Sequence, residues 1–205
     1  MNVFVLNSGR CGSTTFIKAC GHITNYTSSH ESLVNGIGDG RVAYPLNHIE
    51  ADNRLCWFLG RLDVKYGQKA AYVHLTRSRD AVAKSFSKRF DRGIMKAYAQ
   101  GLLTRLPTDF DRLQVAEDYC RTIDENIKLF LRDKHQVIHF RLENANEDFR
   151  TFWNEIGAEG DLHAALKEFD TAHNATPIVR HSLLKRGVMK INRIWKKLPA
   201  FISEA

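Results

Sequence analysis

The apolar positions along this chain follow two patterns in turn, short continuous runs and recurrence at helical spacing. Residues 3–6 form a short apolar run that stops at the polar residues 7–9, and apolar side chains between 16 and 20 then recur at helical spacing. Gly21 follows as a candidate helix C-cap. The chain therefore begins, by this pattern, with a strand, a glycine-containing loop and a helix.

The alternation continues along the rest of the chain. Further strands are predicted at 23–27, 70–75 and 137–142. Apolar side chains at helical spacing predict helices in the segments 55–66, 82–90, 113–130, 149–156 and 162–169. A polar, glycine-rich loop is expected at 28–41. Strands separated by helices indicate an α/β fold with a mostly parallel sheet flanked by helices on both faces.

Composition fits one globular domain spanning residues 1–205. The chain is 43% hydrophobic, and no apolar run reaches the roughly 18 residues that a membrane helix needs. Its four cysteines are widely spaced, which favours reduced, mostly buried thiols over a disulfide framework. The first residues lack the features of a secretory signal. We therefore expect a cytoplasmic protein.

The net charge of +7 equals that of residues 180–197 in the C-terminal segment 180–205, because the other 23 basic and 23 acidic residues cancel. This segment contains seven basic residues before its first acidic one: Arg180, Lys185, Arg186, Lys190, Arg193, Lys196 and Lys197. Such a segment favours an anionic partner, which could be a phosphate-bearing cofactor, a nucleic acid, an acidic glycan or a membrane surface. A solvated helix face is the alternative.

The loop between the first strand and helix has the composition of an anion site. Backbone N–H groups and the positive end of a helix converge on such a loop, and here Arg10 adds a full charge. A nucleotide triphosphatase would need a lysine after the last glycine. Ser13 directly follows Gly12 instead, which disfavours an ATPase or kinase.

A second candidate phosphate site follows the strand at 70–75. Arg77 stands at the strand end, where its planar guanidinium can bind a phosphate through two N–H groups. Ser85 comes eight positions later, two turns into the next helix, and reaches the same group only if the chain folds back over the helix start.

Together these two segments resemble the sulfotransferase superfamily, whose donor is 3′-phosphoadenosine 5′-phosphosulfate (PAPS). The first loop is similar to the family's 5′-phosphosulfate loop over Arg10, Cys11, Gly12, Ser13, Thr14 and Thr15. Arg77 and Ser85 match the residues that bind the 3′-phosphate. The resemblance implies a three-layer, P-loop NTPase-like fold. It also implies sulfuryl transfer to an acceptor hydroxyl without a metal, with adenosine 3′,5′-diphosphate as the product.

The resemblance assigns further roles. Lys185, Arg186 and Gly187 are similar to the start of the loop that closes over the 3′-phosphate, with a solvated basic helix as the alternative. Glu143 matches the acid of a strand–acid–helix passage, where a structural role is expected. Arg10 would stabilise charge on the leaving phosphate.

The family uses either His or Glu as the base that takes the acceptor proton. After the predicted strand at 23–27 the chain offers both, with Glu31 as the first choice and His30 as the second. A surface turn is the alternative. The next cluster of polar residues stands before or at the start of a predicted helix: His48, Glu50, Asp52, Asn53 and Arg54. These side chains could line the acceptor pocket, but capping of the helix start is the favoured role for each. His74, inside a predicted strand, is expected to be packed.

The class of the hydroxyl-bearing acceptor stays open at this stage. No specific nucleic acid is expected, and the basic segment allows peripheral contact with a membrane surface. The alternatives are a non-catalytic polyanion- or nucleic-acid-binding protein and a P-loop nucleotide-dependent, kinase-like transferase. A sulfotransferase fold that binds PAPS without turnover is a third.

Overall fold

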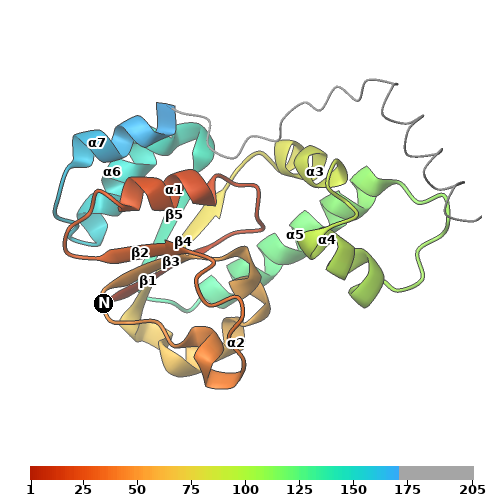
Figure 1. The fold of residues 1–205 in the computed structure, drawn as a ribbon, viewed down its shortest axis with the longest axis horizontal. Helices are drawn as coiled ribbons and strands as arrows, with labels where there is room; N and C mark the ends of the chain where they lie inside the picture. Colours follow the sequence, from red (N-terminus) through yellow and green to blue (C-terminus); the bar gives the residue numbers. More distant parts are fainter. Residues whose placement is uncertain (171–205) are drawn as a thin grey trace, which may run out of the picture. The chain divides into compact units, whose positions relative to one another are not determined.

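The computed structural model describes residues 1–170 (Figure 1). The basic segment 180–205 lies outside the described residues, and so do Lys185, Arg186 and Gly187 with the role predicted for them. Within the described part, no helix is both long and apolar enough to cross a bilayer.

The described residues form a three-layer α/β fold around a five-stranded sheet. The strands are β1 (Asn2–Leu6), β2 (Thr27–His30), β3 (His48–Ala51), β4 (Ala70–Thr76) and β5 (Val137–Arg141). Their order is β2-β3-β1-β4-β5, and every neighbouring pair is parallel. The predicted α/β class with a mostly parallel sheet is confirmed.

Helices connect these strands. The α-helices are α1 (Ser13–Cys20), α2 (Leu59–Lys65), α3 (Arg79–Ser87), α4 (Gly93–Ala97), α5 (Arg112–Leu131), α6 (Ala145–Glu155) and α7 (Leu162–Lys167). A π-helix, η4 (Tyr98–Leu102), continues α4. Short 3₁₀ helices are η1 (Gly38–Val42), η2 (Asn53–Trp57), η3 (Gly67–Lys69), η5 (Leu142–Asn144) and η6 (Glu168–Asp170).

Aromatic side chains fill the core on both faces of the sheet. On the face covered by α1, α6 and α7, the ring of Phe16 packs against three others, which are Phe140, Phe149 and Phe152 (Figure 1). On the face covered by α2 and α5, Phe4 contacts Tyr66 and Tyr72, and Tyr72 contacts Phe130. Burying such rings contributes most of the apolar area that stabilises the fold.

The two strands on one side of the sheet depart from the sequence prediction. The second strand comprises residues 27–30 rather than 23–27, and it is an edge strand of the sequence Thr-Ser-Ser-His. The third strand, 48–51, is fully buried but was not predicted, because His48 and Glu50 interrupt its apolar pattern. The predicted helix at 55–66 is divided into η2 and α2.

The order of strands creates a crevice at the carboxyl edge. From β1 the chain runs through α1 to β2, on one side of β1 in the sheet. From β3 it crosses β1 to reach β4, on the other side of β1. Ligands of open α/β sheets bind where the direction of connection changes in this way. The loops after β1 and β4 therefore flank the expected ligand position.

A buried ion pair holds the segment that precedes α2. Arg41 Nη2 lies 2.5 Å from Asp52 Oδ2, and both side chains are almost completely buried. Asp52 also accepts a hydrogen bond from the Arg54 N–H, 2.8 Å away, and so caps η2. Capping by Asp52 agrees with the sequence prediction.

Asp52→Ala is expected to lower the free energy of unfolding by about 3–5 kcal/mol, because it leaves the Arg41 guanidinium buried without its carboxylate. Chemical denaturation of the variant measures this loss. The double variant Arg41→Met/Asp52→Ala should recover part of it, since it removes the unpaired charge. A single variant within 1 kcal/mol of wild type would contradict the role of the pair.

Candidate functional site

The loop between β1 and α1 is held in an uncommon backbone conformation. Gly9, Arg10 and Gly12 have φ angles of 91°, 60° and 88°. The Asn7 side chain accepts a hydrogen bond from the Gly9 N–H at 2.8 Å, and the Tyr119 hydroxyl donates to the Ser8 carbonyl at 2.8 Å. One contact within the loop and one from α5 thus fix the loop at the start of α1, where helical N–H groups lack intrahelical partners.

Gly12 is required by both conformation and space. It is the N-cap residue of α1 in the left-handed region, and a Cβ atom there would lie 2.6 Å from Leu142 Cδ1. A side chain at this position would therefore strain the backbone and displace the Leu142 side chain.

The fold brings Arg10, Arg77 and Ser85 together. Arg10 Nε donates a hydrogen bond to Ser85 Oγ at 2.9 Å, and Arg77 Nη1 donates to the Arg10 carbonyl at 3.3 Å. Ser85 lies on α3 and Arg77 directly follows β4, so both candidate phosphate-binding segments contact Arg10 of the first loop.

Positive charge is concentrated at this site. The pKa of Arg10 is lowered from its usual value, first by partial burial and then by the like charges of Arg89, Arg77 and Arg92. Guanidinium groups that repel one another in a partly buried site favour binding of an anion, which removes the repulsion.

Other residues of the first loop have distinct environments. Thr15 is buried, whereas Gly12, Ser13 and Thr14 are partly exposed. The Cys11 thiol is buried, and burial raises its pKa to about 11. A neutral, buried thiol is a poor nucleophile, so Cys11 is not a candidate for attack on a substrate.

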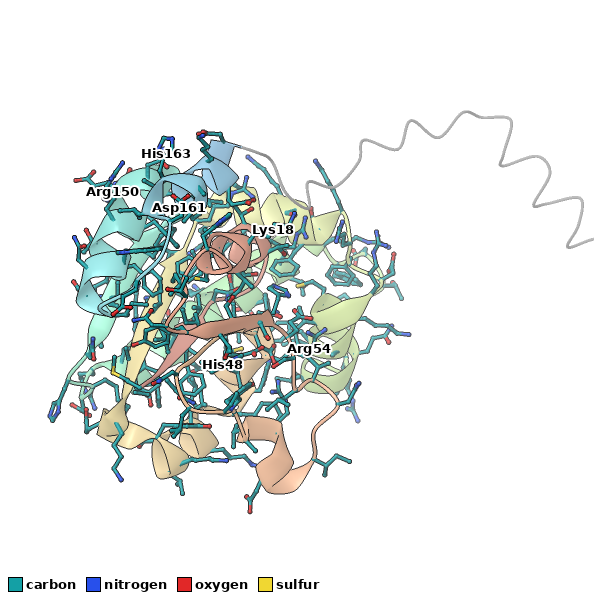
Figure 2. The ribbon with its side chains drawn as sticks, turned by 60° about the vertical axis from the view of Figure 1, so that its left-hand side comes forward. Lys18, His48, Arg54, Arg150, Asp161 and His163 are labelled. Carbon is teal, nitrogen blue, oxygen red and sulfur yellow. The ribbon has the colours of Figure 1, made fainter. Side chains whose placement is uncertain are left out.

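The two candidate bases, His30 and Glu31, differ in their contacts. His30 Nε2 lies 2.9 Å from the Ser13 hydroxyl at the start of α1. Glu31 Oε2 instead lies 2.8 Å from Arg54 Nη1, an ion pair without hydrogen-bond geometry. Arg54 stands beyond the end of β3, whose first residue is His48 (Figure 2). His30 therefore contacts the loop directly, and Glu31 does not.

A buried carboxylate fixes the turn that carries both candidates. Glu50, fully buried on β3, accepts hydrogen bonds from the backbone N–H and the hydroxyl of Ser32. His48 Nε2 lies 3.1 Å from the same carboxylate. Glu31 has a φ of 54°, an unfavourable conformation for a residue with a side chain that these contacts help to maintain. The expected capping role of His48 and Glu50 is wrong, since both support this turn from inside the sheet.

A second polar cluster lies beside the loop and was not found from the sequence. Asp124 on α5 is within 3.3 Å of His74 Nε2 and within 2.8 Å of Lys128 Nζ. It borders a cavity of about 210 Å³ that also reaches Cys11 and Arg77. His74 is buried, as predicted, but its partner comes from a distant helix and leaves no local pattern in the sequence.

Glu143 has a structural contact. Its carboxylate accepts a hydrogen bond from the Ser78 N–H at 2.8 Å, just before α3 begins. The contact ties the end of β5 to the end of β4, in agreement with the structural role expected for this acid. All four cysteines are free and buried, as expected.

Comparison with known proteins gives no family assignment: no protein-family model and no curated sequence matches the chain. Within residues 1–170, no group of three or more His, Cys, Asp or Glu side chains is arranged to hold a metal ion.

His74 is expected to make the fold sensitive to acid. Burial lowers its pKa below the ordinary value of 6.5, with His139 and Lys128 adding to the shift and Asp124 opposing it. The unfolded chain then binds a proton more readily than the folded one, so the free energy of unfolding decreases as the pH falls through 6.5.

Urea denaturation at several pH values between 7.5 and about 5 measures this effect. His74→Gln should show a smaller loss of stability over that range than wild type does. The matched control is His163→Gln on the exposed part of α7 (Figure 2), which should behave as wild type. Identical pH profiles for wild type and His74→Gln would contradict the prediction.

Proposed function

We propose that this protein is a PAPS-dependent sulfotransferase that moves a sulfuryl group to an acceptor hydroxyl. The observation that carries the proposal is the meeting of Arg10, Arg77 and Ser85 at the carboxyl edge of the sheet. These residues belong to the two segments that resemble the PAPS-binding motifs of the superfamily.

The residues of the site fit a ligand with two separated phosphate groups. Arg77 and Ser85 offer a guanidinium and a hydroxyl to the 3′-phosphate, while the loop and the first turn of α1 offer backbone N–H groups to the 5′-phosphosulfate.

PAPS, when bound, supplies the sulfuryl group, and adenosine 3′,5′-diphosphate is the leaving group. The chain's own contribution is positioning and charge stabilisation. Arg10, whose guanidinium is already oriented by Ser85, stabilises the negative charge that develops on the leaving phosphate. Ser13 and Thr14 add hydroxyl donors at the same end of α1.

We assign to His30 the role of the base that takes the acceptor proton, with Glu31 as the alternative. The support is the 2.9 Å contact between His30 Nε2 and Ser13 Oγ, which holds the imidazole against the loop. One carboxylate oxygen of Glu31 pairs with Arg54, so this carboxylate orients the turn. The order of preference is therefore the reverse of the one that the sequence alone suggests.

Isothermal titration with adenosine 3′,5′-diphosphate tests the donor site. Arg77→Ala should weaken binding about 10- to 100-fold, because a charge-assisted hydrogen bond contributes about 1.5–3 kcal/mol. Arg150→Ala, an exposed arginine on α6 (Figure 2), is the control and should bind as wild type. Preference of the wild type for ATP with magnesium over the diphosphate would favour the kinase-like alternative and contradict the proposal.

Turnover of PAPS with a panel of hydroxyl acceptors tests the base. His30→Gln should lower kcat about 10²–10⁴-fold with donor affinity unchanged, because the acceptor proton then has no base. Glu31→Gln should lower kcat much less. A near-normal rate for His30→Gln beside a large loss for Glu31→Gln would transfer the role to Glu31.

A further inference from the structure

Arg89 lies one helical turn beyond Ser85, in the turn that follows α3. Its backbone N–H donates to the Phe86 carbonyl at 2.8 Å, a bond to the third residue back that closes a turn directly after the helix. After burial, the charge of Arg89 is the first cause that lowers the pKa of Arg10, and Arg10 is bonded to Ser85, so Arg89 lies close to this pair. Phe86 and Phe90 are buried on either side of Arg89 and fix the turn against the core.

The Arg89 side chain carries a buried donor without a partner. Its Nε atom is buried, and no hydrogen-bond acceptor reaches it among the residues that the structure describes. A buried donor without an acceptor costs about 1–3 kcal/mol, and such groups are rare in native proteins. An unpaired buried N–H at the rim of a binding site therefore indicates a missing ligand.

Neighbouring carboxylates do not compensate for this charge. The nearest acidic residue in sequence, Asp91, pairs with Arg112 at 3.2 Å. In residues 1–170, no carboxylate forms an ion pair with Arg77, Arg89 or Arg92. The charge of Arg89 instead reaches Arg10, whose Nε is bonded to Ser85. The charges of Arg77, Arg89 and Arg92 thus all act on the arginine that is bonded to Ser85.

We propose that Arg89 binds the 3′-phosphate of the donor, with its buried Nε donating to a phosphate oxygen beside Ser85. The proposal rests on the proposed function, which supplies the phosphate. It adds a ligand-binding residue from outside the two motifs and gives the 3′-phosphate a second guanidinium besides Arg77. Two guanidiniums and a hydroxyl match a dianionic phosphate better than Arg77 and Ser85 alone.

Isothermal titration with two ligands tests this assignment. Adenosine 3′,5′-diphosphate carries the 3′-phosphate, and adenosine 5′-phosphosulfate lacks it. Arg89→Ala should weaken binding of the diphosphate about tenfold or more and change binding of the phosphosulfate less than about twofold. Arg89→Lys, which keeps the charge but has no Nε–H, should show an intermediate loss.

Lys88→Ala is the matched control, since Lys88 is adjacent and exposed, and it should bind both ligands as wild type. Chemical denaturation of each variant establishes that it is folded. Equal losses for the two ligands in Arg89→Ala would overturn the assignment, since Arg89 would not then recognise the 3′-phosphate. Loss of diphosphate binding in Arg77→Ala but not in Arg89→Ala would overturn this inference alone. Failure of the wild type to bind the diphosphate would overturn the proposed function as well.

Discussion

The parallel pairing of β1 with β4 is the constraint on which the candidate site depends. Leu6 stands opposite His74 in this register, so the chain leaves both strands at the same edge of the sheet. The loop that begins at Asn7 and the arginine at position 77 are thereby brought together, although about 70 residues separate them. The hydrogen bond from Arg10 to Ser85 then joins this loop to α3.

The like charges in this site repel one another, and contacts from the surrounding fold must offset this repulsion. Arg10 is partly buried among other arginines, and its lowered pKa reflects that environment. Hydrogen bonds from Asn7 and Tyr119, with the close packing of Leu142 against Gly12, hold the loop despite the repulsion. A site held in this way would bind an anion without first reorganising, which is the electrostatic stabilisation that the proposed function requires.

Local patterns were sufficient to predict β1, β4 and β5, which contain short apolar runs, and most of the helices, which have an apolar face of regular period. The same patterns could not predict β3, since His48 and Glu50 look like surface residues until Ser32 is placed beside the buried carboxylate. The edge strand β2 has no apolar face to reveal it. The spacing of the motifs identified Arg77 and Ser85. The roles of Arg89 and of the pair of His74 with Asp124 depend on contacts between distant segments, which leave no local pattern in the sequence.

A crystal structure of the protein with adenosine 3′,5′-diphosphate tests the central claim most directly. The account predicts the 3′-phosphate between Arg77 and Ser85 and the 5′-phosphate at the backbone of the loop that ends at Gly12, with the His30 imidazole open to the crevice beside it. A nucleotide bound elsewhere on the molecule, or bound in this crevice with its two phosphates exchanged, would contradict it.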